Sequence, residues 1–545
     1  MAVMLLAGPT SGQAQTAVET AELLAGDGAL QDHMGWAVAV DGETAVVSAP
    51  LHDHQGDDSG SAYVYVRDGD AWVERAELLP SDGQQGDHAG QNRIALDGDT
   101  ILIGAHRHTV NNELGRGAVY VFERNGSEWI ETAKLVALDG EPGDQFGVAV
   151  ELDGNTAIVG ANGDRNPNAT QGSVYVFVRE DGEWSQQARL FSAQSVEGYT
   201  GFGERLSIDG NRVAVGAFRT GFQGFDSGSA YIFEREGTTW SQQATILPDD
   251  GKAADQFSIV AIQGDTLMVG ACRCHAPVEG GSVYVFSRIG SEWVQQQEFF
   301  PLDGEALDGF GASVSFVGTT AVIGAPGHGP DPAGAAYLFA REGDTWVEKQ
   351  KLLPLNSKPY DKFGARVASD GKTILIGSRG ELSYPDTGSA TLFDLDAGFQ
   401  INAGLNDAWY NPATSGQGFL LSVFPDEQQM FVAWFTYDSE RPSEGVEATL
   451  GEPGQRWLTA QGVYSGNKAN LTIHLTQGGV FDSPEPAAST DMNGYGTMTI
   501  EFSDCTEGLV NYEITSLGIS GEIPIQRIVT DNVSLCEVLS GDSGA

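Results

Sequence analysis

One pattern recurs seven times along the chain, and it constrains the fold more than any other feature. Each unit has a Phe-Gly-like start, an apolar strand, Asp-Gly, a second apolar strand ending Gly-Ala, a variable loop, and Gly-Ser-x-Tyr-Val-Phe. The starts lie 53 to 57 residues apart, at Met34-Gly35, Ala89-Gly90, Phe146-Gly147, Phe202-Gly203, Phe257-Ser258, Phe310-Gly311 and Phe363-Gly364. A fixed period of this length indicates one supersecondary unit per repeat, packed against its neighbours.

Each repeat is expected to hold four short strands separated by turn residues such as Asp-Gly. In the first repeat these strands are predicted at residues 36–40, 44–48, 61–67 and 72–79. The middle strands are apolar on both faces, as in a sheet covered on each side by a neighbouring sheet. The repeat therefore predicts an all-β fold in which each unit forms one blade of a ring.

The two ends of the repeat region indicate how the ring closes. The fourth strand carries a tryptophan in six repeats, at Trp72, Trp129, Trp184, Trp240, Trp293 and Trp346. The seventh repeat ends after three strands, whereas residues 18–24 copy residues 73–79 at the opposite end. An N-terminal strand that completes the last blade hides its open edge. We predict a seven-bladed β-propeller over residues 17–397, closed by this N-terminal strand.

The repeat resembles a known family. Phe146-Gly147 with Gly160-Ala161, and Phe310-Gly311 with Gly324-Ala325-Pro326, are similar to the FG-GAP repeats of integrin α subunits and of bacterial exported proteins. The resemblance covers residues 17–397 and implies a propeller that binds ligands outside the cytoplasm. Several blades of that family hold calcium in an Asp-x-Asp-x-Asp-Gly loop. The loop here is as short as Asp153-Gly154-Asn155, too few oxygens for the six to eight that calcium takes, so we expect the calcium loops to be lost.

A second domain is expected at residues 399–545, where the repeat is absent. Strands are predicted at residues 419–424, 430–437, 457–464, 469–475, 497–502 and 523–530, which indicates a small antiparallel β-sandwich or barrel. Residues 409–419 with 433–438 resemble an uncharacterised C-terminal module of exported bacterial proteins. Its aromatic residues form either a sugar-stacking face or the core, and core packing is the better expectation; they are Trp409, Tyr410, Trp434, Tyr437 and Trp457.

The net charge of the chain limits the classes of partner that it can bind. The formal net charge is −46, and nucleic acids and anionic membranes draw their affinity from clustered Lys and Arg, so both are disfavoured. No apolar run reaches the roughly 18 residues that would span a bilayer. The surface is expected to be acidic and solvated.

The N-terminus and the cysteines bear on localisation. Residues 1–16 indicate either an export signal or a disordered terminus, with the short apolar run at residues 2–7 favouring export.

Of the four cysteines, Cys505 and Cys536 are the expected disulfide, whereas a bridge between Cys272 and Cys274 would be strained. We expect a secreted, periplasmic or cell-surface protein.

The candidate binding site lies on the face that carries the long variable loops, because such loops on a rigid scaffold usually hold binding residues. Histidines gather in the loops of the first two repeats. The candidate ligand-binding residues are His52, His54, Asp53, Asp57, His106 and His108. The four histidines are also candidate zinc or copper ligands through their imidazoles. The alternative is that they are ordinary polar loop residues.

The absence of common catalytic motifs argues against an enzyme. The sequence contains no Gly-x-Ser-x-Gly elbow, His-Glu-x-x-His helix, phosphate loop or Rossmann glycine pattern. We therefore expect an exported recognition protein that binds a protein or glycan, rather than an enzyme. Two alternatives stay open: a secreted polysaccharide hydrolase or lyase on a propeller scaffold, and a structural module of an envelope assembly.

Overall fold

The protein divides into two compact units, Met1–Leu395 and Asp396–Ala545. The computed structural model describes all residues except 1–15, 70, 166–171, 195–198, 273–279, 330, 381–387, 396–400, 414–417, 426–427, 438–454, 466, 478–488, 491–493, 516, 530–531, 534 and 537–545. Within this part of the chain, no helix is both long and apolar enough to cross a membrane.

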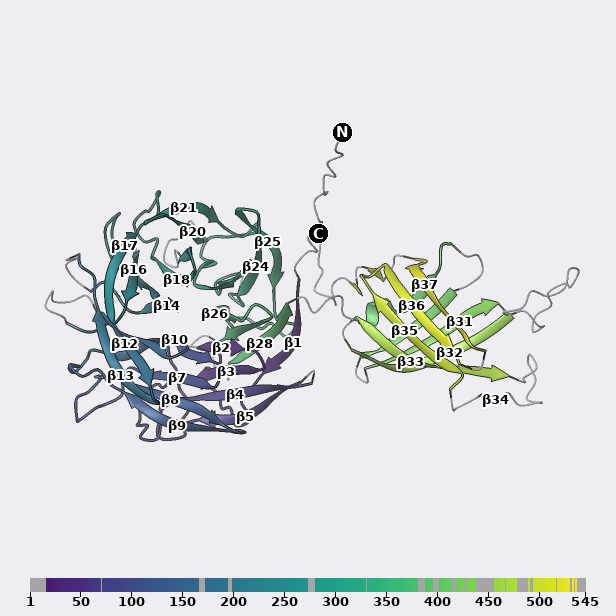
Figure 1. Ribbon diagram of the computed structural model, residues 1–545, viewed down its shortest axis with the longest axis horizontal. Helices are drawn as coiled ribbons and strands as arrows, with labels where there is room; N and C mark the ends of the chain where they lie inside the picture. Colours follow the sequence, from purple (N-terminus) through teal and green to yellow (C-terminus); the bar gives the residue numbers. More distant parts are fainter. Residues whose placement is uncertain are drawn as a thin grey trace, which may run out of the picture. The chain divides into compact units, whose positions relative to one another are not determined.

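The first unit is a seven-bladed β-propeller, each blade an antiparallel sheet of four strands (Figure 1). Blades one to three are β2 (Val38–Asp41), β3 (Thr44–Ala49), β4 (Ser61–Asp68), β5 (Ala71–Leu78); β6 (Ile94–Asp97), β7 (Thr100–Ala105), β8 (Ala118–Asn125), β9 (Glu128–Leu135); β10 (Phe146–Asp153), β11 (Thr156–Ala161), β12 (Ser173–Glu180), β13 (Glu183–Leu190). Blades four and five are β14 (Arg205–Asp209), β15 (Arg212–Ala217), β16 (Ser229–Glu236), β17 (Thr239–Ile246); β18 (Phe257–Gln263), β19 (Thr266–Ala271), β20 (Ser282–Ile289), β21 (Glu292–Phe299). Blades six and seven are β22 (Ser313–Val317), β23 (Thr320–Ala325), β24 (Ala335–Glu342), β25 (Thr345–Leu352); β26 (Phe363–Ser369), β27 (Thr373–Ser378), β28 (Ser389–Leu395) and β1 (Ala17–Leu23).

The ring closes as the sequence predicts. Strand β1 pairs antiparallel with β28 and completes the seventh blade, so the sheet order there is β1-β28-β27-β26. Its pairing carries a β-bulge between Glu19 and Ala21, and a bulge recurs where the outer strand pairs with the third strand in each of the other six blades. The N-terminal strand is therefore a full structural copy of an outer strand. The innermost strands contact one another in turn around the axis, from β2 through β6, β10, β14, β18 and β22 to β26 and back to β2.

The core lies between blades. Phe146 and Tyr175 are fully buried, and their ring centroids are 5.5 Å apart in an edge-to-face arrangement that recurs in blades four, five and six. Each hydrophobic cluster joins residues of two adjacent blades, and one cluster joins blade seven to blade one. Blades therefore stabilise each other in pairs around the closed ring.

Glycine sets how closely blades approach. The Gly of each Gly-Ala pair faces the carbonyl of the Phe-Gly-like start of the next blade, and a Cβ at Gly160 would overlap the carbonyl oxygen of Gly203. The same overlap occurs between Gly104 and Gly147, and between Gly324 and Gly364. The Phe-Gly and Gly-Ala signatures of the sequence are thus two sides of one contact between backbones.

The Asp-Gly hairpins occupy the opposite face from the long loops, and they also link blades. The side chain of Asp41 accepts a hydrogen bond from the amide of Gly98 in the next blade. Equivalent bonds join Asp97 to Gly154, Asp153 to Gly210, Asp209 to Gly264, Gln263 to Gly318 and Asp370 to Gly42. The carboxylates of these shortened loops therefore bind the neighbouring blade.

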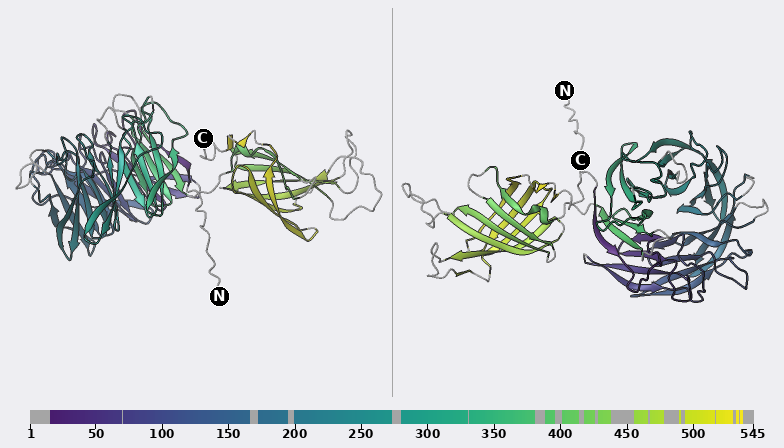
Figure 2. Two further views of the ribbon diagram at one scale, coloured as in Figure 1. Left: turned by 90° about the horizontal axis from the view of Figure 1, so that it is seen from above. Right: turned by 180° about the vertical axis from the view of Figure 1, so that it is seen from behind.

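The second unit is a closed antiparallel barrel of eight strands, with β34 (Ser489–Thr490) added to one end (Figure 2). A 3₁₀ turn, Ala403–Leu405, precedes β29 (Asp407–Tyr410), β30 (Gly418–Phe424), β31 (Gln429–Tyr437), β32 (Gln455–Ser465), β33 (Lys468–Gln477), β35 (Gly496–Phe502), β36 (Glu507–Ile514) and β37 (Ile519–Arg527). The pairing of β32 with β33 closes the sheet on itself. Fully buried Arg527 joins the barrel end to the turn: it pairs with Asp407 at 3.2 Å, donates to the carbonyls of Gly404 and Cys505, and lies over Trp409.

The predictions for this unit hold in part. The barrel and the Cys505–Cys536 disulfide are confirmed. Trp409 and Trp434 are buried in the core, which excludes them from a sugar-stacking face. Strands β29 and β36 were not predicted, and β37 begins earlier than residue 523. Cys274 lies outside the described residues, as do the side chains of Tyr437 and Trp457.

Replacing Gly160 tests the contact between blades. Gly160→Ala should lower the free energy of unfolding of the propeller by about 2 kcal/mol or more, because the added Cβ overlaps the Gly203 carbonyl and overpacks the contact. Gly154→Ala is the control, since no atom lies within 4 Å of its Cβ position and only backbone strain of roughly 1 kcal/mol is expected. Urea unfolding followed by tryptophan fluorescence measures both. Equal losses would contradict the overlap.

A second pair of variants tests ring closure. Leu23 in β1 is 2% exposed and Leu24 is 54% exposed. Leu23→Ala should destabilise the propeller by about 3 kcal/mol, the usual effect of deleting a buried leucine, whereas Leu24→Ala should change stability by less than about 0.5 kcal/mol. The same unfolding measurement applies, and a neutral Leu23→Ala would show that β1 does not hold the ring.

Candidate functional site

The loop face is built from the loops between second and third strands and those that lead into the next blade. Buried carboxylates shape the latter loops. Asp32, Asp87 and Asp308 each accept a hydrogen bond from the amide three residues earlier. The same side chains each contact a histidine of the adjacent loop: His52, His108 and His328 respectively. Asp and His together thus hold the two loop sets in place.

His52 and His54 converge at blade one. His52 Nδ1 lies 3.1 Å from Asp32 Oδ2, and its Nε2 lies 3.3 Å from Glu77 Oε1 and 3.8 Å from Asp27 Oδ2. His54 Nδ1 lies 3.7 Å from Glu77 Oε2. One ligand atom from each of His52, His54 and Glu77 lies within 4.8 Å of the others. We call Asp27, His52, His54 and Glu77 the blade-one cluster.

The second pair of candidate histidines does not join this cluster. His108 is fully buried at blade two, where Lys134 Nζ lies 2.8 Å from its Nε2. His106 is buried beside Arg107, and burial lowers its pKa to about 3, so it is neutral at physiological pH. The structure therefore separates the four candidate histidines into one open cluster and two packed side chains.

Asp53 and Asp57 are exposed loop residues that stabilise turns. Asp53 Oδ1 accepts a hydrogen bond from the amide of Asp58 at 2.8 Å. Asp57 Oδ2 accepts one from the side-chain amide of Gln85 at 3.1 Å, across to the next loop. Both are placed to order the loops around the blade-one cluster.

A pocket of about 330 Å³ opens on the loop face at the mouth of the central channel. Its lining comes from the loop ends of six blades, so it exists only in the closed ring. Arg205, Arg366 and Arg379 line it together with Trp36, Phe218 and Glu204. The guanidinium of Arg379 stacks on Trp36, 4.6 Å from the ring centroid. We call this the channel pocket.

The channel pocket is electropositive. Burial lowers the pKa of Arg366 well below its usual value, and the charges of Arg205, Arg93 and Arg379 lower it further. Its hydrogen bonds among the described residues go to main-chain carbonyls, those of Ala365 and Asn92. Three guanidinium groups thus lie near one another with Glu204 as the lining carboxylate, in a chain with 75 acidic and 29 basic residues.

Deeper in the channel, Arg93 and Glu151 face each other. Arg93 Nη1 lies 3.8 Å from Glu151 Oε1, while buried Arg93 Nε has no hydrogen-bond partner among the described residues. Burial raises the pKa of Glu151 to about 7, against the opposing effect of Arg93. This carboxylate therefore changes charge near neutral pH and leaves the channel more cationic when protonated.

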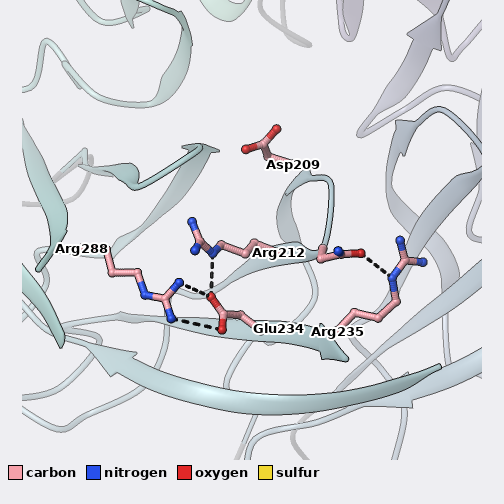
Figure 3. A pocket seen from close by; sticks show the side chains of 6 residues that line it. Asp209, Arg212, Glu234, Arg235 and Arg288 are labelled. Carbon is pink, nitrogen blue, oxygen red and sulfur yellow. Dashed lines mark hydrogen bonds and ion pairs between the residues drawn. The ribbon is translucent and has the colours of Figure 1, made fainter. Parts of the chain in front are cut away.

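A second pocket, of about 270 Å³, lies on the hairpin face between blades four and five (Figure 3). Glu234 Oε1 accepts from Arg212 at 2.6 Å and lies 2.9 Å from Arg288 Nη1, so both cations are paired. Equivalent arginines of other blades, such as Arg124 and Arg179, stack on the tryptophan of the outer strand and bond the preceding blade. This pocket is a gap in a structural ion-pair network, and it offers no unpaired group to a ligand.

In the comparison with known proteins, the matched segments recur with the period of the blades. A family model described as FG-GAP repeat matches seven segments, residues 17–65, 72–122, 129–177, 184–233, 240–286, 293–339 and 346–393, which together span more than half of the chain. The chain belongs to the FG-GAP repeat family. No curated protein matches it.

Each FG-GAP repeat starts at an outer strand and ends with the third strand of the next blade, so every repeat bridges two blades. The first begins at Ala17, the start of closing strand β1. This offset explains why strand β1 of the first repeat completes the blade formed by the seventh.

The sequence alone did not identify Asp27, Glu77 or the channel arginines as site residues. For Glu77 and for the channel arginines, a comparison of the repeats with one another gives a sequence signal. Glu77 lies opposite Tyr63 in the pairing of blade one, and the equivalent position holds Lys134, Arg189 and Lys351 in other blades. Arg205 and Arg366 follow the Phe-Gly-like start by two residues, as Gly203-Glu204-Arg205 and Gly364-Ala365-Arg366, whereas Arg379 directly follows Gly377-Ser378.

Titration of Glu151 gives a test of the channel electrostatics. The folded pKa, about 7, exceeds the usual value of 4.5, so the folded state binds the proton more tightly and stability falls as pH rises from 4.5 to 7. Glu151→Gln removes this dependence. Its melting temperature should rise relative to the wild type across that window and stay level above it, measured by differential scanning fluorimetry. Exposed Glu180→Gln is the control, and parallel curves for Glu151→Gln and wild type would refute the assignment.

Proposed function

We propose that this FG-GAP protein is an exported recognition protein whose loop face binds a protein or glycan ligand through an anionic group held in the channel pocket. The observation that supports this most is the concentration of arginine at the pocket. Like charges brought together in a partly desolvated place raise the energy of the folded protein, and such arrangements occur at functional sites. A carboxylate or sulfate would form charge-assisted hydrogen bonds with Arg205, Arg366 and Arg379.

The dimensions and lining of the pocket agree with a small-group site. Its volume of about 330 Å³ lies at the lower end of ligand pockets, enough for one sugar ring or one acidic side chain. Trp36 and Phe218 supply apolar faces beside the guanidinium groups. A ring or an aliphatic stem packed there would orient the anionic group toward the arginines.

Apolar side chains elsewhere on the loop face also favour recognition. Large apolar side chains are exposed on several loops of the loop face, and five are more than three-quarters exposed: Leu114, Leu138, Phe225, Leu302 and Leu355. Exposed aliphatic and aromatic residues interspersed with polar ones are typical of contact surfaces. The ligand therefore contacts the loop face through apolar groups and the channel through its charge.

The negative charge of the rest of the protein affects which ligands can reach the channel pocket. With a net charge of −46, long polyanions are repelled by the surface as a whole, whereas a single anionic group reaches the arginines at short range. This supports a ligand with local rather than extended negative charge. The Cys505–Cys536 disulfide supports an oxidising compartment outside the cytoplasm.

The hydrolase or lyase alternative draws on one observation. Histidines and carboxylates do converge on the loop face, at the blade-one cluster. The same frame recurs in blades two and six with a lysine at its centre, which supports a role in blade architecture over acid–base chemistry. The structural-module alternative is less favoured, because the loop face carries a formed pocket.

Loss of Arg366 tests the proposed site. Arg366→Gln should weaken binding of an acidic probe by roughly tenfold or more, since one charge-assisted contact is lost. The probes are galacturonic acid, an oligosaccharide with a single sulfate and a peptide with a single acidic side chain, with a neutral oligosaccharide as negative control, in calorimetric titrations at two salt concentrations. Binding should weaken with salt.

Arg75→Gln provides the matched control, because Arg75 is half exposed on the outer strand of blade one and pairs with Asp68. It removes the same charge and should leave affinity unchanged. Equal effects of the two variants, or no binding of any acidic probe by the wild type, would contradict the proposal.

A further inference from the structure

Blades two and six share a frame of four side chains centred on a lysine. In blade two, Lys134 Nζ lies 2.7 Å from Asp82 Oδ2 and 2.8 Å from His108 Nε2, and Tyr120 donates to Asp82 Oδ1. In blade six, Lys351 has the same neighbours, at 2.8 Å from Asp303 and 2.6 Å from His328. In both frames the other histidine nitrogen contacts a buried carboxylate, that of Asp87 or Asp308.

In blades two and six this outer-strand position therefore holds a cation, whereas blades five and seven carry Glu298 and Glu22 there and blade four carries Thr245. An ammonium group placed between a carboxylate and an imidazole nitrogen fixes the proton of the histidine on Nδ1, because Nε2 must accept from lysine. Blade three fills the same place with another cation: Arg189 pairs with Asp139 and Asp164. Three blades thus provide the positive charge from their own outer strand.

Blade one keeps the frame and lacks that charge. Tyr63 donates to Asp27 Oδ1 at 2.8 Å, and His52 Nδ1 lies 3.1 Å from Asp32, as in blades two and six. The outer strand, however, provides Glu77 in place of lysine. Buried Glu77 Oε1 has no partner of hydrogen-bonding geometry among the described residues. Two carboxylates and the Nε2 lone pair of His52 therefore face a position that holds an ammonium elsewhere.

We propose that blade one binds a zinc ion at this position, through His52 Nε2, His54 Nδ1, Glu77 and Asp27. Two imidazoles and carboxylates are zinc ligands, and a tetrahedral site with bonds of about 2.0 Å places neighbouring ligand atoms about 3.3 Å apart. The separations from His52 Nε2 to Glu77 and to Asp27, and from His54 to Glu77, are 3.3, 3.8 and 3.7 Å. Small side-chain rotations bring these atoms to the zinc.

The surroundings of His52 support zinc binding. A zinc-bound histidine usually donates its other ring N–H to a carboxylate, which fixes the tautomer. Asp32 provides that acceptor and is itself held by the amide of Ala29 at 2.7 Å. The site is also accessible, because the side chains of His54 and Asp27 are 49% and 54% exposed.

Zinc here would stabilise the ring closure. Asp27 lies in the loop that leads from closing strand β1 to blade one, whereas His52, His54 and Glu77 belong to blade one itself. A metal bridge between them joins the seventh blade to the first across the junction. The proposed site is separate from the channel pocket and does not depend on an anionic ligand.

The test measures zinc in the full-length protein. Chelator-treated wild type, equilibrated with zinc chloride and dialysed, should contain about one zinc per chain by elemental mass spectrometry. At a hundredfold excess over Kd its melting temperature should rise by about 3 °C. Glu77→Lys installs the ammonium of blades two and six, so it should fold, bind no zinc at this site and melt independently of zinc.

Two further variants make the outcome decisive. His54→Asn changes an exposed side chain and should weaken zinc binding by roughly tenfold or more without loss of fold. Asp68→Lys makes the same charge change as Glu77→Lys on the opposite face of blade one and should keep the full zinc content. Zinc content equal in wild type and both Glu77→Lys and His54→Asn, or no zinc in wild type, would overturn the proposal.

Discussion

The approach of one backbone to another across each blade junction is the constraint on which the propeller depends. Gly104, Gly160 and Gly324 face the carbonyls of Gly147, Gly203 and Gly364 with no room for a side chain. Main-chain atoms set this distance at the junctions that carry the glycine, whereas Ser48 takes its place between blades one and two, and the seven innermost strands contact one another in turn around one channel. The loops at the ends of the strands carry no such restriction, so the sequence can vary there without opening the ring.

The fold could be predicted from the sequence because its determinants are local and repeated. Phe-Gly, Gly-Ala and Asp-Gly each mark a turn or contact that recurs with the period, and the copy of residues 73–79 at residues 18–24 gives the closure. Strand β36 was missed although exposed Asn511 and Glu513 alternate with the more buried Val510, Tyr512 and Ile514. The sites could not be predicted in the same way, because Arg93, Arg205 and Arg366 meet only after seven blades have closed.

The channel arginines show what the ring makes possible. A position near the start of an innermost strand is remote in sequence from its equivalents, yet the axis brings such positions within reach of one another. At Arg366, burial and the neighbouring cations lower the pKa of the guanidinium. Holding these charges together therefore raises the electrostatic free energy of the folded protein. Glu151 and Glu204 offset part of it. The gathering of cations at the axis of a strongly acidic chain is the feature on which the proposed anion site rests.

The residues of blade one can be compared with those at equivalent positions in the other blades of the same chain. Equivalent positions lie under the same backbone restraints, so differences between blades arise from the side chains; Glu298 of blade five stands opposite Tyr284 as Glu77 stands opposite Tyr63. Glu77 replaces the lysine of blades two and six, and in the same blade His54 stands where they carry Val110 and Pro330. A carboxylate in place of an ammonium, by itself, would leave like charges opposed around His52. A second imidazole beside it makes the pair of changes consistent with a bound cation, since both changes add a metal ligand and only one of them alters the charge.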